Sequence, residues 1–397
     1  MNLIFNTYVI SPHSWPMIRD LARLYPDVHV DYFYQSRKVE ENRTNAILAE
    51  AGKIARLVDA KSAGFFKACA EVDYLVEGER DLDIILDRVR CGRPTVYMSE
   101  RWFKPIRIGN RKSQENSTGS GIRIPGFLRM VLPFGIKRAL RMKRLMEGRK
   151  PFYYLPIGIR AAEDMARMIG LLHGELSCLF HAPQLEYEHC AGGRIFAKNG
   201  KDHLYGTDRM RMWGYFVDQG AEVHGEKGMN VRTRTRSLRV LWIGRMIGCK
   251  RVDTIIRAVG GVENLELGLY GAGPKERQIR QMASMFKNIH VGGAMTLTEV
   301  RAKMREYDLF VLSSNDFEGW GAVVNEALEE GLKVVGTYEA GASATILPGS
   351  NLFHAGDWRR LREILAHPIP DIRIGDWSVK SAAKALVTMY RDLSREH

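Results

Sequence analysis

Two glutamates flank a glycine-rich turn in the later part of the chain, within the sequence SSNDFEGWGAVVNEALEEG. Glu318 lies in a predicted loop, and Glu326 lies eight residues later, inside a helix that we expect to begin near Gly321. Gly319 and Gly321 let the backbone approach a ligand closely and leave its N–H groups free. Carboxylates in such a place suit hydroxyl groups, as on a sugar or a ribose. Taken singly, either glutamate is more often a solvated charge.

Two cations follow another predicted strand, in the sequence IGRMIGCKRVD. Gly244 allows a tight turn, and Arg245 and Lys250 then lie close to the start of the next predicted helix. Helix N-termini already favour anions, so two added cations suit a diphosphate better than a single phosphate. The alternative is a surface turn with solvated charges. Together with the two glutamates, the cations indicate one ligand site.

A third loop, YGAGPKE, contains Gly271 and Gly273. The third glycine of a dinucleotide-binding fingerprint is missing, and so is an acidic residue at the end of the following strand. The pattern therefore favours a tight turn from strand to helix over a dinucleotide site.

Predicted strands and helices alternate along the whole chain, which indicates an α/β fold with largely parallel sheets. In the first half, strands are predicted at 3–10, 28–34, 72–76, 95–98, 152–157 and 177–181, with helices such as 39–58 and 81–89. In the second half, strands are predicted at 238–243, 265–270, 289–291, 309–312 and 334–337, with helices at 252–259, 275–286, 297–305, 322–330 and 358–366. Ligands bind at the carboxyl ends of strands in such sheets, and the loops singled out above follow predicted strands.

The alternation predicts two doubly wound domains. The first covers residues 1–230 and carries a basic insertion at 101–150, and the second covers 238–375. The last helix, within 378–397, is expected to pack back on the first domain.

Length and composition exclude several classes of protein. The chain has 397 residues, of which 45% are hydrophobic and 26% charged, as in ordinary globular proteins. No apolar stretch approaches the ~18 residues of a membrane-spanning helix. The first residues do not resemble a signal peptide, and the five cysteines are an odd number without a CxxC pair. We therefore expect a protein of the reducing cytosol that begins at Met1 and has neither a disulfide framework nor a zinc site.

One segment carries nearly all of the net charge of +13. Residues 101–150 hold fourteen Lys or Arg against two Glu, or +12. On a helical wheel, one side shows Ile136, Ala139, Leu140, Met142 and Met146 and the other shows Lys137, Arg138, Arg141 and Arg144, while Lys143 and Leu145 break the pattern. Residues 122–150 are thus predicted to lie on an anionic membrane surface, and the alternative is a solvated helical face.

The stretch 238–366 resembles the C-terminal domain of glycosyltransferase family 4, retaining enzymes of the GT-B fold that use nucleotide-sugar donors. The resemblance covers about a third of the chain and rests on these residues: Gly244 and Arg245, Lys250, GAGP at 271–274, Ser313 and Ser314, EGWGAVVNE at 318–326, and Gly331. It implies two Rossmann-like domains facing each other across a cleft. It also implies that Arg245 and Lys250 hold the donor diphosphate, Glu326 the ribose hydroxyls and Glu318 the hydroxyls of the transferred sugar.

Two departures from the family pattern bear on the first domain and on the donor sugar. Many relatives carry a histidine after the strand that corresponds to 95–98, where this chain has Ser99, Glu100 and Arg101. Glu100 is the candidate for that role, and an ion pair with Arg101 is the alternative. His13, in the turn after the first strand, is a second candidate for substrate contact, against an ordinary loop histidine. After residue 335 the expected paired glycines are replaced by the sequence YEAGASA.

The expected function is transfer of a sugar from a nucleotide-diphosphate sugar to a glycan or lipid-linked acceptor, with retention of configuration, in cell-surface polysaccharide synthesis. No cofactor is expected, and no DxD-type pair indicates a metal, so the cations and the helix dipole would stabilise the leaving diphosphate. The predicted location is the cytoplasmic face of the membrane, with no nucleic-acid partner. The alternatives are a nucleotide-sugar epimerase of GT-B fold and a nucleic-acid-binding protein that uses the basic segment.

Overall fold

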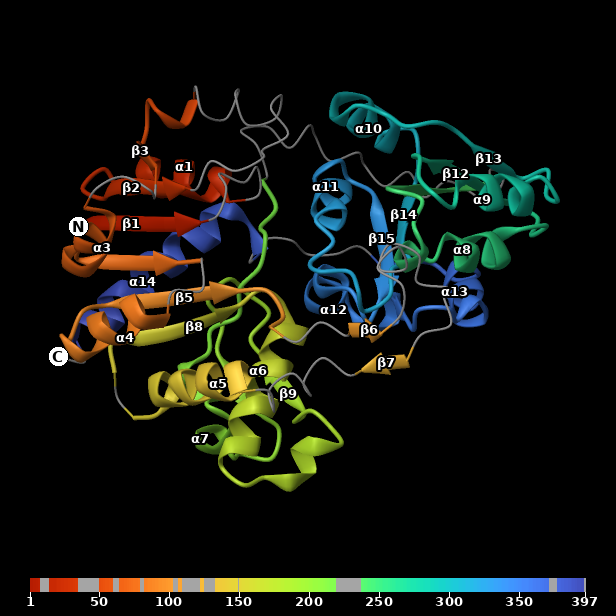
Figure 1. The fold of residues 1–397 in the computed structure, drawn as a ribbon. Coiled ribbons are helices and arrows are strands. Elements are labelled where there is room, and N and C mark those ends of the chain that lie inside the picture. The colour runs from red at the N-terminus through yellow and green to blue at the C-terminus, as the bar shows by residue number, and fades with distance from the viewer. Residues whose placement is uncertain are drawn as a thin grey trace. The chain divides into compact units, whose positions relative to one another are not determined.

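A computed structural model describes residues 1–7, 14–34, 50–59, 64–78, 82–102, 106–108, 122–124, 133–148, 150–218, 237–370 and 377–395. The chain divides into two compact units (Figure 1). The first unit comprises Met1–Phe103, Phe127–Asp218 and Gly375–His397, and the second comprises Lys104–Gly126 and Gln219–Ile374.

The first unit contains a parallel sheet of six strands in the order β3-β2-β1-β4-β5-β8. The strands are β1 (Asn2–Thr7), β2 (His29–Tyr34), β3 (Arg56–Asp59), β4 (Tyr74–Glu77), β5 (Thr95–Ser99) and β8 (Phe152–Pro156). The main helices are α1 (Trp15–Leu24), α3 (Phe65–Glu71), α4 (Leu82–Arg90), α5 (Pro133–Met146), α6 (Ile159–Leu172) and α14 (Val379–Arg395). Strands β4, β5 and β8 are buried throughout, as expected for parallel strands covered on both faces.

Smaller elements complete this unit. They are the 3-10 turns η3 (Leu176–Leu179) and η4 (Thr207–Arg209), the short helix α7 (Asp202–Tyr205), and the antiparallel strands β9 (Leu185–Tyr187) and β10 (Ile195–Ala197). A second antiparallel pair, β6 (Ile106–Ile108) with β7 (Ile122–Ile124), falls in the second unit.

Two predictions for the first unit are wrong. Residues 177–181 do not form a strand, because η3 occupies Leu176–Leu179. The predicted helix 39–58 does not reach its expected end, since Arg56–Asp59 form β3 and pair with β2. Residues 39–49 of that helix lie outside the described part. Short apolar runs fit a strand or a helix equally well, and sheet pairing decides between them.

Helix α5 departs from the predicted two-sided pattern. Ala139, Met142 and Leu145 are fully buried, whereas Ile136 and Leu140 remain exposed. Thus Leu145, which breaks the wheel, belongs to the buried side, and the apolar side serves mainly the core of the unit. On the other side, the Arg138 guanidinium lies 4.0 Å from the ring centre of Trp102. Arg141 pairs with Asp83 at 2.8 Å.

A buried arginine holds the centre of the first unit together. Arg88 on α4 is only 1% exposed. Its Nη1 donates to the carbonyl of Cys69 at 2.7 Å and to that of Val72 at 2.9 Å, and its Nη2 donates to the carbonyl of Pro94 at 2.9 Å. Because a buried cation requires such partners, Arg88 fixes α3 and the start of β5 in place.

The second unit contains another parallel sheet of six strands, in the order β13-β12-β11-β14-β15-β16. The strands are β11 (Leu238–Ile243), β12 (Leu265–Tyr270), β13 (Ile289–Val291), β14 (Leu309–Leu312), β15 (Lys333–Thr337) and β16 (Leu352–Phe353). The helices are α8 (Val252–Val259), α9 (Glu276–Ala283), α10 (Leu297–Met304), α11 (Val323–Glu329), α12 (Gly341–Ile346) and α13 (Trp358–Leu365), with the turns η5 (Gly248–Lys250) and η6 (Gly349–Asn351). All five strands predicted for this half are present, and the sequence analysis missed β16 and α12.

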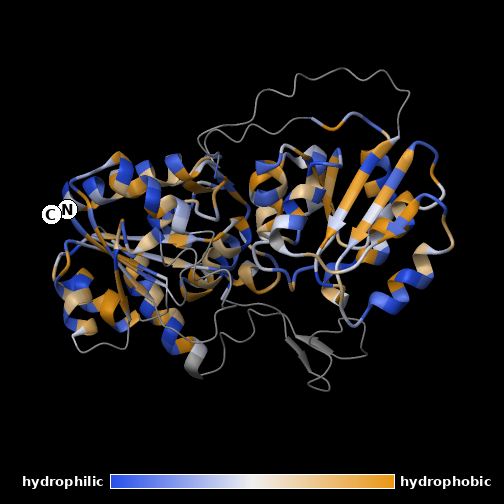
Figure 2. Ribbon diagram, turned by 90° about the horizontal axis from the view of Figure 1, so that it is seen from above, coloured by the Kyte–Doolittle hydropathy of each residue, from blue (hydrophilic) through white to orange (hydrophobic). Residues whose placement is uncertain are grey.

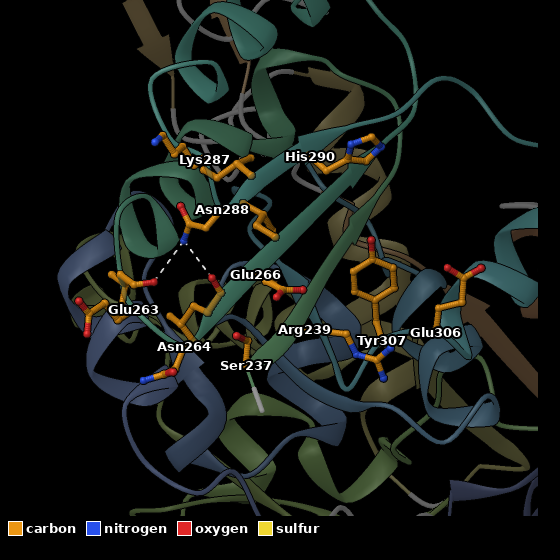
Figure 3. A pocket seen from close by; sticks show the side chains of 14 residues that line it. Ser237, Arg239, Glu263, Asn264, Glu266, Lys287, Asn288, His290, Glu306 and Tyr307 are labelled. Carbon is orange, nitrogen blue, oxygen red and sulfur yellow. Dashed lines mark hydrogen bonds between the residues drawn. The ribbon is translucent and has the colours of Figure 1, made fainter. Parts of the chain in front are cut away.

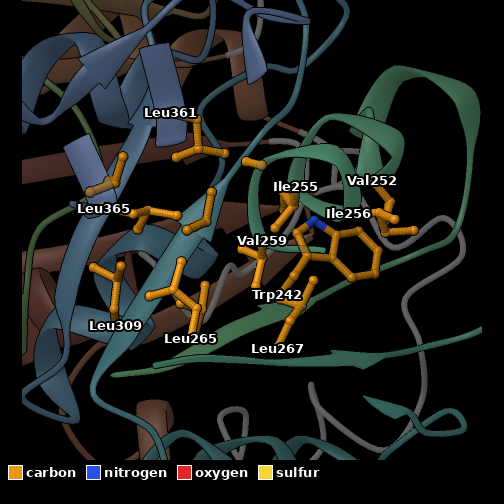
Figure 4. Packing of buried hydrophobic residues seen from close by; sticks show 14 of the residues in the cluster. Trp242, Val252, Ile255, Ile256, Val259, Leu265, Leu267, Leu309, Leu361 and Leu365 are labelled. Carbon is orange, nitrogen blue, oxygen red and sulfur yellow. The ribbon is translucent and has the colours of Figure 1, made fainter. Parts of the chain in front are cut away.

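Apolar spacing explains how α8 packs. Val252, Ile255, Ile256 and Val259 recur at helical spacing and are all buried. They meet Trp242 of β11 in one core cluster, which α13 joins through Leu361 and Leu365 (Figure 4). Helices elsewhere in the protein also show alternating hydrophilic and hydrophobic bands, as Figure 2 shows.

The end of the chain returns to the first unit. Val217 pairs in parallel with Ser378, and the indole N–H of Trp377 donates to the carbonyl of Tyr215 at 3.2 Å. Helix α14 then packs against α1. Among the described residues, no helix combines the length and the hydrophobicity that crossing a bilayer requires.

Candidate active site

Strands β11 and β14 lie side by side at the point where the order of strands in the second sheet reverses. The chain proceeds from β11 through β12 to β13 on one side, and from β14 through β15 to β16 on the other. Ligands bind outside the carboxyl ends of the strands at such a switch point. The loops after these two strands are joined there: the Asn315 N–H donates to the carbonyl of Cys249 at 2.8 Å, and the Ser313 hydroxyl donates to that of Lys250 at 2.6 Å.

An ion pair spans the two loops. The Lys250 ammonium donates to Oε2 of Glu318, which also accepts a hydrogen bond from the Ser314 hydroxyl at 2.7 Å. The side chains are only 20% and 14% exposed, for Lys250 and Glu318 respectively, so the pair is well shielded from water. In such surroundings an ion pair is stronger than on an open surface. Lys250, which is predicted to hold the donor diphosphate, and Glu318, which is predicted to hold the transferred sugar, are therefore direct partners.

Cys249 directly precedes Lys250 and is influenced by the charged groups of these loops. Burial raises the pKa of the Cys249 thiol. The positive charges of Lys250 and Arg245 oppose that rise, and the carboxylate of Glu318 adds to it. Of these charged groups, Lys250 and Glu318 are in direct contact, and Arg245 is exposed on the same loop as Lys250. Sequence reasoning did not single out Cys249, because no motif marks it.

The loop after β14 is held in a defined shape. Gly321 has a φ of +86°, which favours glycine, and a Cβ there would lie 2.9 Å from Cδ2 of Leu312. The buried Trp320 donates through its indole N–H to Oδ1 of Asn325 at 2.7 Å, which ties the loop to α11. Glu326 lies in the first turn of α11. The structure thus places Glu326 on the helix that directly follows the Glu318 loop.

Close loop packing explains other glycines of the motif. A Cβ at Gly271, where φ is +138°, would lie 1.9 Å from the carbonyl oxygen of Gly244. The loops after β11 and β12 approach each other only because Gly271 has no side chain. The Gly244 N–H is used in this contact and donates to the carbonyl of Tyr270 at 3.0 Å. The carbonyl of Gly319 accepts from the N–H of Gly341 at 3.0 Å, so the Glu318 loop also contacts the start of α12.

The two other candidates for substrate contact, Glu100 and His13, belong to the first unit. Glu100 follows β5 and accepts a hydrogen bond from the Tyr215 hydroxyl at 3.4 Å. Burial and, second, the charge of Glu100 raise the pKa of Tyr215. The guanidinium of Arg101 pairs with Asp164 at 2.7 Å. His13 lies outside the described residues.

A buried polar pair in the first unit escaped the sequence analysis. Asn6 of β1 and Glu77 of β4 are neighbours in register at the carboxyl ends of their strands. Both are buried, at 1% and 0% exposure, and the Asn6 amide donates to Oε2 of Glu77 at 2.8 Å. Among the described residues, Oδ1 of Asn6 has no hydrogen-bond partner. The order of strands in the first sheet also reverses between β1 and β4. Because ligands bind at such switch points, this rule could have identified the pair.

A separate hollow of about 620 Å³ lies at the amino ends of β11, β12 and β13 in the second sheet (Figure 3). Its lining includes Arg239, which pairs with Asp308 at 3.0 Å. It also includes Asn288, whose amide donates to the carbonyls of Val259, Val262 and Leu265. These polar groups serve the packing of the sheet edge. In the described part of the chain, no cluster of three or more His, Cys, Asp or Glu could hold a metal ion.

Comparisons with known proteins bear on the fold and on the second unit. Residues 237–367 match the family described as glycosyl transferases group 1, and no curated protein sequence matches the chain significantly. The HepE protein of Anabaena, solved in complex with UDP, is similar with a TM-score of 0.54 at 13% identity, over 100% of this chain and 99% of that chain. The lipopolysaccharide outer core galactosyltransferase WaaB, solved in its apo form, is similar with a TM-score of 0.55 at 11% identity, over 99% of this chain and 97% of that chain.

The protein is an α/β protein of the GT-B fold, as these structures and the two parallel sheets show. Within its second unit, residues 237–367 resemble the group 1 glycosyltransferases.

Proposed function

We propose that this chain is a retaining glycosyltransferase of the hexosyltransferase type. It transfers a sugar from a nucleotide-diphosphate sugar to a glycan or lipid-linked acceptor, in the synthesis of a cell-surface polysaccharide on the cytoplasmic side of the membrane. The observation that carries the proposal is the contact between Lys250 and Glu318 at the carboxyl ends of β11 and β14, the switch point of the second sheet. The family match of residues 237–367 supports it, and the UDP complex of HepE favours UDP as the first nucleotide to test.

Charge development assigns a role to each group. Cleavage of the bond between sugar and diphosphate leaves negative charge on the departing nucleotide and positive charge on the sugar. Arg245 and Lys250 supply the positive charge that stabilises the departing diphosphate, and the proposal includes no metal ion in this role. Glu318 accepts hydrogen bonds from the transferred sugar, and Glu326 accepts them from the ribose.

Donor binding in this scheme includes an exchange of partners. The diphosphate takes the Lys250 ammonium, and the Glu318 carboxylate turns to hydroxyl groups. Ser314, which already donates to Glu318, keeps that carboxylate solvated by protein during the exchange. The site therefore presents its two charges to the donor without exposing an unpaired one beforehand.

The buried pair of the first unit suits the acceptor side of the reaction. A carboxylate and an unsatisfied amide oxygen at a switch point are suited to ordering a site for hydroxyl groups. Because both side chains are almost fully buried, we assign Asn6 and Glu77 as positioning residues and not as catalytic ones. The proposal keeps Glu100 and His13 as candidates for direct contact with sugar or acceptor.

A donor screen tests the proposal. The full-length protein is incubated with UDP-, GDP- and ADP-sugars, with and without a glycan or lipid-linked acceptor. We expect one donor to raise the melting temperature and to release nucleoside diphosphate as the sugar is transferred with its anomeric configuration retained. Isomerisation of the donor sugar without an acceptor would instead identify an epimerase, and inversion of the anomer would contradict retention.

A further inference from the structure

Five large apolar side chains of the first unit are exposed on α5 and around η3. They are Ile136 and Leu140 on α5, and Leu176, Leu179 and Phe180 on and directly after η3. Leu176 is 69% exposed and Phe180 is 77% exposed. Apolar residues scattered singly need no explanation, but three on one short turn indicate a surface that binds something.

The η3 turn is held firmly to the body of the unit. The Arg167 guanidinium donates to the carbonyls of Cys178 and Leu179, both at 2.6 Å. Cys178 is 2% exposed and packs against α6, where a Cβ at Gly170 would lie 2.9 Å from its Sγ. The turn therefore has one buried and fixed side, and its remaining apolar side chains point outward because the fold holds them there.

Helix α5 is bonded to the segment that leads into η3. The Lys143 ammonium donates to the carbonyl of Leu172 at 3.1 Å, and His173 lies 3.5 Å from the carboxylate of Glu147. Lys137 and Arg144 of the same helix are exposed. The segment that leads into the exposed turn thus contacts α5, a helix that presents cations to solvent.

The local charge favours an anionic partner. Helix α5 presents the exposed cations Lys137 and Arg144, and the acidic residue at the start of the turn, Glu175, is paired with Lys201 at 3.2 Å. Apolar side chains flanked by lysine and arginine match a lipid surface. The apolar side chains contact the acyl chains, and the cations contact the anionic headgroups. A protein partner would need a matching acidic and apolar face.

We propose that the η3 turn and the exposed face of α5 bind an anionic lipid surface, with Leu176, Leu179 and Phe180 inserted among the headgroups. This inference deepens the proposed function, because it would hold the enzyme beside a lipid-linked acceptor. It differs from the prediction that the apolar side of residues 122–150 lies on the membrane, since Ala139, Met142 and Met146 of that side are buried in the first unit.

Vesicle flotation of the full chain tests the proposal. The vesicles contain phosphatidylcholine and phosphatidylglycerol at about two to one, which gives a negative surface. We expect the wild type to float with these vesicles. The double variant Leu176→Ser/Phe180→Ser should bind at least about tenfold more weakly, because it removes two inserted side chains. The variant Lys137→Gln/Arg144→Gln should weaken binding to the anionic vesicles and leave binding to pure phosphatidylcholine unchanged.

Phe66→Ser provides the matched control. Phe66 lies on α3 in the same unit and is 66% exposed, so its replacement removes a similar side chain from another surface. It should leave flotation unchanged. Far-ultraviolet circular dichroism and thermal unfolding of each variant confirm that the fold is intact.

Three results would overturn the proposal. They are wild-type protein that does not float, a turn variant that floats like the wild type, and a dimer in light scattering that the turn variant converts to a monomer. The last result would identify the surface as a contact between copies of the chain. Stabilisation of the wild type and the turn variant by a nucleoside diphosphate is measured in parallel, so that failure of the lipid proposal is distinguished from failure of the proposed function.

Discussion

Lys250 and Glu318 are direct partners across the loops that follow β11 and β14, although the two residues lie 68 positions apart in the sequence. The cation proposed for the diphosphate thus neutralises the carboxylate proposed for the sugar. A donor must separate them, and each then gains a partner on the donor. This exchange gives different expectations for the two glutamates and the lysine.

Replacement of Glu318 should reduce turnover without weakening nucleotide binding. In Glu318→Gln the Lys250 ammonium loses its competitor, so UDP should bind at least as tightly as to the wild type, while kcat should fall by about 100-fold or more. Steady-state kinetics and calorimetric titration with UDP measure the two effects. A variant with wild-type kcat would remove Glu318 from the site.

Glu326→Ala should affect nucleotide binding more than turnover. Loss of the ribose contact is expected to weaken nucleotide binding by about 10- to 100-fold, because a hydrogen bond to a charged group contributes ~1.5–3 kcal/mol. The same titration, with Glu329→Ala on the same helix as a comparison, distinguishes a ribose contact from a general effect on α11. Equal nucleotide affinity of wild type and Glu326→Ala would contradict the assignment.

Gly271→Ala should damage the donor site through the backbone. The added Cβ would collide with the carbonyl of Gly244, so the loops after β11 and β12 must separate. We expect lower stability by several kcal/mol together with weaker nucleotide binding. Gly349→Ala is the control, because no atom lies within 4 Å of a Cβ there. Similar melting temperatures for the two variants would show that the close approach is not required.

Cys249 offers a chemical reporter of donor binding. Burial raises its pKa, so at any pH below that value a smaller fraction is thiolate than for an ordinary thiol, and alkylation is correspondingly slower. Iodoacetamide should modify the exposed Cys91 first, and the Cys249 rate should still rise with pH above about 9, where an ordinary thiol is already mostly thiolate. Bound UDP should protect Cys249 and leave Cys91 unaffected. Peptide mass spectrometry measures both, and undiminished labelling of Cys249 in saturating UDP would place the nucleotide elsewhere.

Glu77→Gln tests the acceptor-side assignment. The substitution keeps the size of the side chain and removes the charge that the Asn6 amide contacts. We expect the KM for the acceptor to rise or kcat to fall by about tenfold, with UDP affinity and donor hydrolysis unchanged. Asn6→Asp should do the same, since it sets two acidic groups against each other. Unchanged acceptor kinetics in folded protein would leave the pair a structural role alone.

The second unit could be predicted almost element by element. Its strands are short, apolar and separated by helices such as α8, whose four buried residues recur at helical spacing. The first unit could be predicted less well, because long-range contacts decide it. The sequence of β3 acquires its conformation from pairing with β2, and η3 from its contacts with α6. Arg88 shows the same limit, since nothing in an amphipathic helix distinguishes a buried arginine from a solvated one.

The residues of the candidate site were likewise easier to predict in the second unit than in the first. Arg245, Lys250, Glu318 and Glu326 stand out because charged residues and glycines follow apolar strands. Asn6 and Glu77 lie 71 positions apart, and only the strand order makes them neighbours. The Lys250–Glu318 contact could not be predicted either, since it depends on how two loops approach.

The affinity of Lys250→Ala for UDP, compared with its affinity for uridine, tests the central claim most directly. If Lys250 holds the diphosphate, the variant should bind UDP about 10- to 100-fold more weakly than the wild type and bind uridine equally well. It should differ in this from Lys303→Ala, which removes a lysine of α10 in the same unit that pairs with Glu306. Equal affinity of the wild type and Lys250→Ala for UDP would contradict the account.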